Sequence, residues 1–248
     1  MKILCLDGWE SDSLKQIFSS EASARLSFDF AQAPLISTQV TPPDATTART
    51  PDSTRAKEDF TWISKKLQTD GPYDGVIAYS RAAALISSFL LTQQWYSPEL
   101  PPPFRFAFFI AGSIPLPTLR RLGVPVPAQA QHTVRESQRR ARESRPPHPQ
   151  HVGSARRAVY NSDDCFGLNL NEIPLELKIR IPTVHAWGEG DPLFPGATQL
   201  AGLCDPYIRR IHVFEGAHGL PGGEGDVKEL RGLVAWCVQR ASWPGDGE

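Results

Sequence analysis

Residues 75–84 read Gly75-Val76-Ile77-Ala78-Tyr79-Ser80-Arg81-Ala82-Ala83-Ala84, and they contain the strongest structural signal in the chain. The apolar run before Ser80 is typical of a buried strand, and the alanine-rich run after it is typical of a helix. A serine between a strand and a helix lies on a sharp turn, where small residues two positions before and after it relieve crowding. Both positions are alanine here, whereas the usual pattern is G-x-S-x-G. The stretch also fits an ordinary helix N-cap serine.

Two further turns follow predicted strands downstream of Ser80. The predicted strand 181–187 ends in a Gly-Glu-Gly-Asp-Pro turn that contains Asp191, and the predicted strand 208–214 ends in Glu-Gly-Ala-His-Gly, which contains His218. Ligand sites in parallel sheets lie at the carboxyl ends of the strands, so we expect all three side chains at one edge. A serine nucleophile needs a histidine to take its proton and a carboxylate to orient that histidine. The order Ser, Asp, His therefore favours nucleophilic catalysis.

A fourth turn follows the first predicted strand, residues 2–6, and reads Asp7-Gly8-Trp9-Glu10. We expect a backbone N–H in this turn, that of Trp9, to act with the N–H of Arg81 in stabilising an oxyanion. The alternative interpretation of these residues is a plain tight turn.

The remaining elements alternate between strand and helix along the chain. We predict the strands at 2–6, 26–31, 74–79, 104–110, 181–187 and 208–214, and the helices at 12–21, 55–68, 82–94 and 226–240. Residues 34–55 are rich in Pro, Thr, Ser and Asp and are interpreted as a loop. This alternation predicts one α/β domain over residues 1–248, built on a doubly wound, mostly parallel sheet.

One segment of the chain has a different composition. Residues 115–158 contain seven prolines and nine arginines against two glutamates, a local charge of +7 in a chain of net charge −1. One interpretation is a solvated loop. The other is a lid over the active site, with a basic surface for an acidic partner. We place this lid-like insertion at 115–175, between two strands of the sheet.

Composition excludes several classes of protein. With 40% hydrophobic and 21% charged residues, the chain is globular, and its net charge of −1 gives no attraction to nucleic acid or an anionic membrane. The sequence has no apolar run of transmembrane length and no signal peptide, and its four irregularly spaced cysteines disfavour a disulfide scaffold or zinc site. We therefore expect a cytoplasmic protein without a metal.

Four motifs together resemble the fungal serine hydrolase family of α/β-hydrolases. They are Met-Lys-Ile-Leu-Cys-Leu-Asp-Gly-Trp at the start, Gly-Pro-Tyr-Asp-Gly-Val-Ile-Ala-Tyr-Ser-Arg-Ala-Ala-Ala-Leu around Ser80, Ile-Pro-Thr-Val-His-Ala-Trp-Gly-Glu-Gly-Asp-Pro-Leu at Asp191 and Glu-Gly-Ala-His-Gly at His218. The resemblance spans residues 1–220. It implies Ser80, Asp191 and His218 as the catalytic triad, Trp9 and Arg81 as donors of the oxyanion amides, and no metal or organic cofactor.

The resemblance also implies a substrate class. Members of this family include esterases and thioesterases that act beside fungal polyketide synthases and release or trim acyl chains. We therefore expect a serine hydrolase that cleaves an ester or thioester of a polyketide-type substrate in secondary metabolism. The substrate is a small molecule, free or presented by a carrier protein, and the enzyme is a monomer or a homodimer.

Two departures from the family pattern keep other functions open. Relatives usually have His-Gly where this chain has Asp7-Gly8, and the residue after the nucleophile is here the charged Arg81. A carboxylate at the end of the first strand can act as base, acid or nucleophile, which would suit an epoxide hydrolase or a polyketide cyclase with Asp7 taking part. The relaxed elbow also allows a degenerate hydrolase that serves as a binding protein.

Overall fold

A six-stranded parallel sheet organises the part of the chain that the computed structural model describes, residues 1–8, 11–18, 25–33, 52–147 and 164–242. The strand order is β2-β1-β3-β4-β5-β6. The strands are β1 (Lys2–Asp7), β2 (Ser27–Gln32), β3 (Gly75–Tyr79), β4 (Phe106–Ile110), β5 (Thr183–Gly188) and β6 (Arg209–Phe214). The doubly wound sheet predicted from the sequence is confirmed, and all of its strand pairs are parallel.

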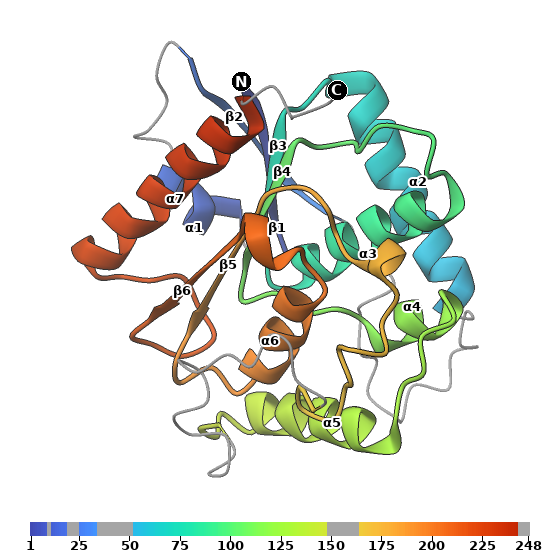
Figure 1. The fold of residues 1–248 in the computed structure, drawn as a ribbon. Coiled ribbons are helices and arrows are strands. Elements are labelled where there is room, and N and C mark those ends of the chain that lie inside the picture. The colour runs from blue at the N-terminus through green and yellow to red at the C-terminus, as the bar shows by residue number, and fades with distance from the viewer. Residues whose placement is uncertain (9–10, 19–24, 34–51, 148–163, 243–248) are drawn as a thin grey trace.

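Helices cover both faces of the sheet (Figure 1). They are α1 (Ser11–Phe18), α2 (Asp52–Asp70), α3 (Arg81–Tyr96), α4 (Leu116–Arg121), α5 (Ala128–Arg142), α6 (Phe194–Gly202) and α7 (Glu224–Ser242), with short 3-10 turns at Leu175–Leu177 and Pro206–Ile208. Helices α1 and α7 lie on one face, whereas α2, α3, α4 and α6 lie on the other. Of the described helices, none has the length and apolarity needed to cross a membrane.

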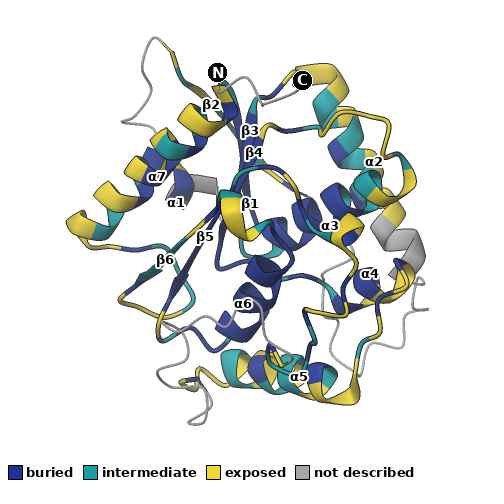
Figure 2. Ribbon diagram, in the orientation of Figure 1, coloured by how far each residue is buried: buried dark blue, intermediate teal, exposed yellow. Residues whose placement is uncertain are grey.

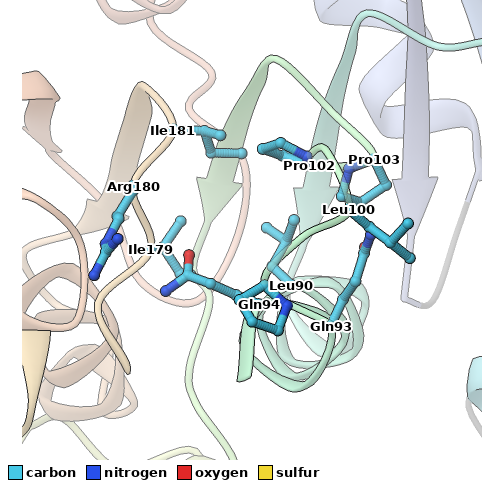
Figure 3. A pocket seen from close by; sticks show the side chains of 10 residues that line it. Leu90, Gln93, Gln94, Leu100, Pro102, Pro103, Ile179, Arg180 and Ile181 are labelled. Carbon is cyan, nitrogen blue, oxygen red and sulfur yellow. The ribbon is translucent and has the colours of Figure 1, made fainter. Parts of the chain in front are cut away.

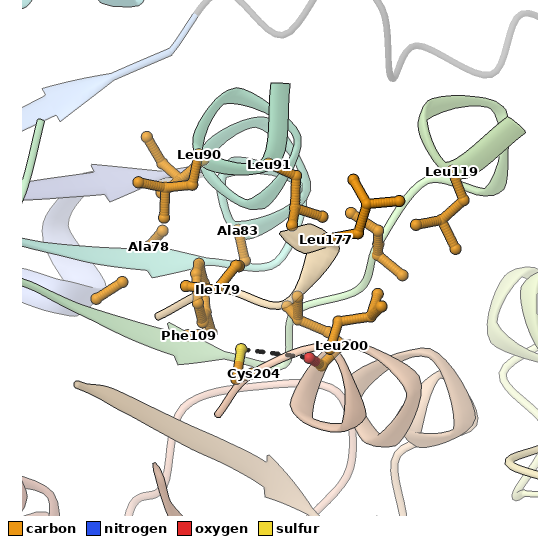
Figure 4. Packing of buried hydrophobic residues seen from close by; sticks show 14 of the residues in the cluster. Ala78, Ala83, Leu90, Leu91, Phe109, Leu119, Leu177, Ile179, Leu200 and Cys204 are labelled. Carbon is orange, nitrogen blue, oxygen red and sulfur yellow. Dashed lines mark hydrogen bonds between the residues drawn. The ribbon is translucent and has the colours of Figure 1, made fainter. Parts of the chain in front are cut away.

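Side chains alternate between the two faces of the sheet along each strand, and so a hydrophobic core forms on each face. In β4 all five residues are buried, with Phe109 on the α3 side and Phe108 on the side of α1 and α7. A strand covered on both faces has no polar positions, which is why this one is apolar throughout. Figure 2 shows the burial concentrated in the strands and in the helix faces that meet them. Figure 4 shows the larger core, in which leucines of α3 pack against α4, α6 and the sheet.

The sequence prediction differs from the structure mainly in the helices. Helix α6 was not predicted, and α4 and α5 form within the insertion that the composition favoured as a loop or lid. Helix α2 begins three residues before the predicted start at Arg55. The predicted loop at 34–55 falls mainly on residues outside the described part of the chain, as do residues 148–158 of the insertion.

Candidate active site

The strand–turn–helix at Ser80 has the geometry of a nucleophile elbow. Ser80 has φ 55° and ψ −116°, in the left-handed half of backbone space that residues other than glycine seldom adopt. Its N–H donates to the carbonyl of Ile110 at 2.8 Å, and so the turn is tied to β4. Ala78 and Ala82 are both fully buried. Their small side chains fit the crowded surroundings of the turn. The turn places the Ser80 hydroxyl within hydrogen-bond distance of His218.

A hydrogen-bonded chain links the three residues that the sequence placed at this edge. Ser80 Oγ lies 2.9 Å from His218 Nε2, and His218 Nδ1 lies 2.8 Å from Asp191 Oδ2. With its proton on Nδ1, the imidazole donates to Asp191 and accepts from the Ser80 hydroxyl. Asp191 is 1% exposed, whereas His218 is 27% exposed. The carboxylate is therefore shielded from water, and the histidine remains accessible to a substrate.

Backbone contacts hold Asp191 and its loop in place. The second carboxylate oxygen of Asp191 accepts from the N–H of Leu193 at 2.7 Å, so both oxygens are engaged. The N–H of Gly190 donates to the carbonyl of Gly216 at 2.8 Å, which joins the loop after β5 to the loop after β6. A Cβ on Gly188 would come within 2.5 Å of Gly216 O. The glycines in these turns thus permit the close approach that brings histidine and aspartate together.

The turn after β1 lies directly against the elbow. An ideal Cβ on Gly8 would lie 3.0 Å from the amide nitrogen of Arg81 and 3.2 Å from that of Ala82. These are the first amides of α3, and the first N–H groups of a helix have no acceptor within the helix. Amides at a helix N-terminus beside a nucleophile are the kind of donor that stabilises an oxyanion. Trp9, the other predicted donor, lies outside the described residues.

Asp7 lies at the end of β1 and is 1% exposed. Both ring nitrogens of His218 are already engaged by Ser80 and Asp191, and so the proton relay is complete without Asp7. A carboxylate that attacks a substrate, or takes a proton from it, must reach that substrate. Asp7 is nearly as buried as Asp191, and its part in the reaction stays a prediction.

The insertion contacts the helix that follows Asp191. Helix α5 packs beside α6 (Figure 1), and the last described part of the insertion, residues 164–175, contacts both helices. In that segment Gly167 lies against α5, since a Cβ there would be 2.5 Å from Ala130 N, and Phe166 meets Phe194 of α6 edge-on at 5.5 Å. The function of this insertion as a lid stays a prediction.

A pocket of about 170 Å³ lies near the amino ends of β4 and β5 (Figure 3). Its lining comes from the C-terminal half of α3 and from the segments that lead into β4 and β5, including Leu90, Pro102 and Ile181. These segments precede their strands, whereas the triad follows its strands. The pocket is therefore not the place where an acyl group would meet Ser80.

Sequence reasoning missed two contributions to this site. The first is the packing of Gly188 against the loop of His218, and the second is a hydrogen bond at 2.8 Å from the Arg81 guanidinium to the carbonyl of Gly8. Both join segments far apart in the chain. The glycines flanking Glu189 indicated that another backbone segment could approach this turn closely. The sequence around Arg81, in contrast, does not indicate which group its long side chain contacts.

Comparisons with known proteins identify the family of the chain. The family model for serine hydrolase (FSH1) matches residues 47–230. The chain is 28% identical over 205 residues to esterase alnB of Emericella nidulans, covering 72% of each chain, and 27% identical over 177 residues to esterase tropF of Talaromyces stipitatus, covering 64% of this chain and 49% of tropF.

Solved structures share the fold at low sequence identity. An epoxide hydrolase from Bacillus megaterium superposes with a TM-score of 0.54 at 11% identity, covering 96% of this chain and 93% of that one. Acyl-protein thioesterase 2 of Zea mays superposes with a TM-score of 0.51 at 14% identity, covering 97% and 93% of the two chains. At such identities the likeness establishes the α/β-hydrolase fold alone. With the family match over most of its length, the chain belongs to the serine hydrolase (FSH1) family.

Proposed function

We propose that this protein cleaves an ester or thioester of a polyketide-type acyl compound in secondary metabolism, through an acyl-enzyme on Ser80. The observation that carries the proposal is the chain of contacts from Ser80 Oγ through His218 to Asp191, at 2.9 and 2.8 Å. These distances are those of hydrogen bonds that can pass a proton and orient the ring. The esterase relatives from two fungi support the reaction class.

The first half of the reaction forms the acyl-enzyme. Ser80 Oγ attacks the carbonyl carbon while His218 Nε2 takes the hydroxyl proton, and the carbonyl electrons move onto oxygen. The Arg81 N–H donates to that oxyanion, and Asp191 stabilises the imidazolium through Nδ1–H. Collapse of the tetrahedral intermediate breaks the bond to the alcohol or thiol, which leaves with the proton held on Nε2.

The second half releases the acid. Water attacks the acyl carbonyl as His218 takes its proton, and a second tetrahedral intermediate expels Ser80 Oγ, which recovers a proton from the imidazolium. Water and the ester are thus converted to acid and alcohol, with no other reactant. A carrier protein that presents the acyl chain as a thioester is included in the proposal, because a thiol is expelled as readily as an alcohol.

Turnover on a paired substrate series tests this proposal. We would assay p-nitrophenyl esters from acetate to decanoate and the matching N-acetylcysteamine thioesters, with wild type, Ser80→Ala and His218→Ala. Loss of the nucleophile or the base is expected to lower kcat by about 10⁴-fold or more. Circular dichroism would verify that both variants fold. Turnover that persists in Ser80→Ala would contradict the proposal.

A further inference from the structure

Tyr79 is the last residue of β3 and directly precedes Ser80. Side chains alternate along a strand, so Tyr79 lies on the same face of the sheet as Ile77, which is buried in the core beside α1 and α7. The Tyr79 side chain is half-buried and packs against this core, and its backbone lies opposite Ile110 of β4. The strand and the core together therefore fix the position of the Tyr79 ring.

The ring of Tyr79 lies beside the ring of His218. The two centroids are 6.0 Å apart, and the ring planes are inclined by 25°. This is the offset-stacked arrangement that aromatic rings favour, with centroids about 4.5–7 Å apart. The imidazole therefore has a contact along its face in addition to the two at its nitrogens, where Nε2 lies 2.9 Å from Ser80 Oγ and Nδ1 lies 2.8 Å from Asp191 Oδ2.

The contact at Nε2 changes once an acyl-enzyme forms. In the free enzyme the Ser80 hydroxyl donates to Nε2 of the neutral ring. In the acyl-enzyme Ser80 Oγ is an ester oxygen without a proton, so that it and Nε2 are both acceptors and no longer bond to each other. A hydrogen bond at Nδ1 alone leaves the imidazole able to tilt about that end. An aromatic ring packed along its face limits this tilt.

We propose that Tyr79 is a positioning residue for His218 and that it acts mainly in deacylation. Its ring holds the imidazole in the orientation from which Nε2 takes a proton from the attacking water. In acylation the Ser80 hydroxyl shares this role, and so that step depends less on Tyr79. The role belongs to the aromatic ring and does not require the hydroxyl of Tyr79. The inference rests on the proposed function, since the two steps exist only if Ser80 forms an acyl-enzyme.

The test measures the two steps separately in wild type, Tyr79→Phe and Tyr79→Leu. Phenylalanine retains the ring without the hydroxyl, and leucine retains an apolar side chain without a ring. The substrate is p-nitrophenyl dimethylcarbamate, because a carbamoyl-enzyme hydrolyses slowly enough for both steps to be followed. Release of p-nitrophenol with enzyme in excess gives the rate of acylation, and decay of the modified intact mass gives the rate of deacylation. Tyr96→Leu, at an exposed tyrosine that ends α3, is the control.

We expect Tyr79→Leu to lower the rate constant of deacylation by about 3- to 10-fold, the effect of losing one aromatic pair, and that of acylation by less than about twofold. On p-nitrophenyl butyrate, kcat/KM reports acylation and should likewise stay within about twofold of wild type. Tyr79→Phe and Tyr96→Leu should retain both rate constants. Circular dichroism would verify folding, and Tyr79→Met, which also lacks a ring, replaces Tyr79→Leu if that variant does not fold.

Three outcomes would overturn the inference and leave the proposed function intact. The first is that both rate constants are unchanged in the folded variant without a ring. The second is an equal loss in the two steps, which would make Tyr79 a general support of the site. The third is an equal loss in Tyr79→Phe, which would assign the effect to the hydroxyl. A folded wild-type protein that neither turns over esters nor reacts with a fluorophosphonate would instead overturn the proposed function, and the inference with it.

Discussion

At the scale of single residues, Ser80 occupies a backbone conformation that the rest of the fold must maintain. A non-glycine residue with φ 55° costs about 1–3 kcal/mol relative to ordinary backbone. The hydrogen bond from its N–H to Ile110 and the burial of Ala78 and Ala82 on either side maintain it. In this conformation Ser80 Oγ lies 2.9 Å from His218 Nε2.

The Asp7 side chain gives the first prediction. We expect Asp7→Asn to retain ester turnover within about threefold, because the hydrogen bonds from Ser80 through His218 to Asp191 do not include Asp7. Loss of a general acid or base would lower turnover by far more than about threefold. Kinetics on p-nitrophenyl butyrate and on styrene oxide would be measured side by side, with Ser80→Ala as the matched variant. Epoxide opening that survives Ser80→Ala but is lost in Asp7→Asn would establish the alternative chemistry.

At the scale of elements, the site depends on two loops that lead out of neighbouring strands. Because β5 and β6 are parallel and adjacent, their carboxyl ends bring the loops of Asp191 and His218 together. The bonds from Glu189 N–H to Phe214 O at 2.9 Å and from Gly190 N–H to Gly216 O at 2.8 Å fix their spacing. A displacement of one loop is therefore a displacement of aspartate relative to histidine.

Gly188→Ala tests this dependence. The added Cβ would lie 2.4 Å from Ala217 O and 2.5 Å from Gly216 O, so the loop of His218 must shift. A misplacement of about 1 Å in a catalytic group can cost about 100-fold in rate, and we expect a loss of kcat on that order. Gly225→Ala, at a helix position with open space around it, is the control. Equal activities of the two variants would contradict the account of the loops.

The elements also show what the sequence could and could not reveal. Each predicted strand was found, because buried parallel strands are short apolar runs that end at turns. Helix α6 was missed because Pro195, Gly196 and Gly202 are poor helix formers, and its stability comes from tertiary burial. Helix α5 was missed because it buries only Ala130 and Ser137, too few positions for an apolar period.

The site was predictable in part for a similar physical reason. Ser80, Asp191 and His218 were found because each follows a strand, and parallel strands direct their carboxyl ends to one edge. The Arg81–Gly8 bond and the contact of Gly188 with Gly216 were not predictable, because sequence order does not give the path of a long side chain or the separation of two loops.

At the scale of the whole molecule, a titratable side chain is enclosed by the larger core. His185 lies on β5, 1% exposed, with its ring 5.4 Å from that of Phe109 and its Nε2 3.2 Å from Thr183 Oγ1. Burial, and then the positive charge of Arg209, lower the pKa of His185 to about 3. The folded protein therefore keeps this ring neutral at pH values where the unfolded chain would protonate it.

This burial makes global stability depend on pH. A histidine pKa lowered by folding leaves stability complete above the unfolded value of about 6.5 and reduces it as the pH falls from there toward 3. We expect His185 to contribute a loss of about 1.4 kcal/mol per pH unit in that window. The measurement is urea unfolding between pH 7.5 and 4.5 for wild type and His185→Gln. The free energy of unfolding should change less with pH in His185→Gln than in wild type. The exposed His132→Gln is the control, and equal slopes in all three proteins would contradict the assignment.

The most direct test of the central claim is the intact mass of the protein after treatment with a fluorophosphonate. Wild type, Ser80→Ala and Asp7→Asn would be labelled in parallel, with folding verified for each. We expect one phosphonyl group per chain in wild type and in Asp7→Asn, and none in Ser80→Ala, since only a serine activated by His218 and Asp191 reacts readily. A folded wild-type protein that remains unlabelled would contradict the activation of Ser80. It would favour the alternative reaction in which Asp7 takes part.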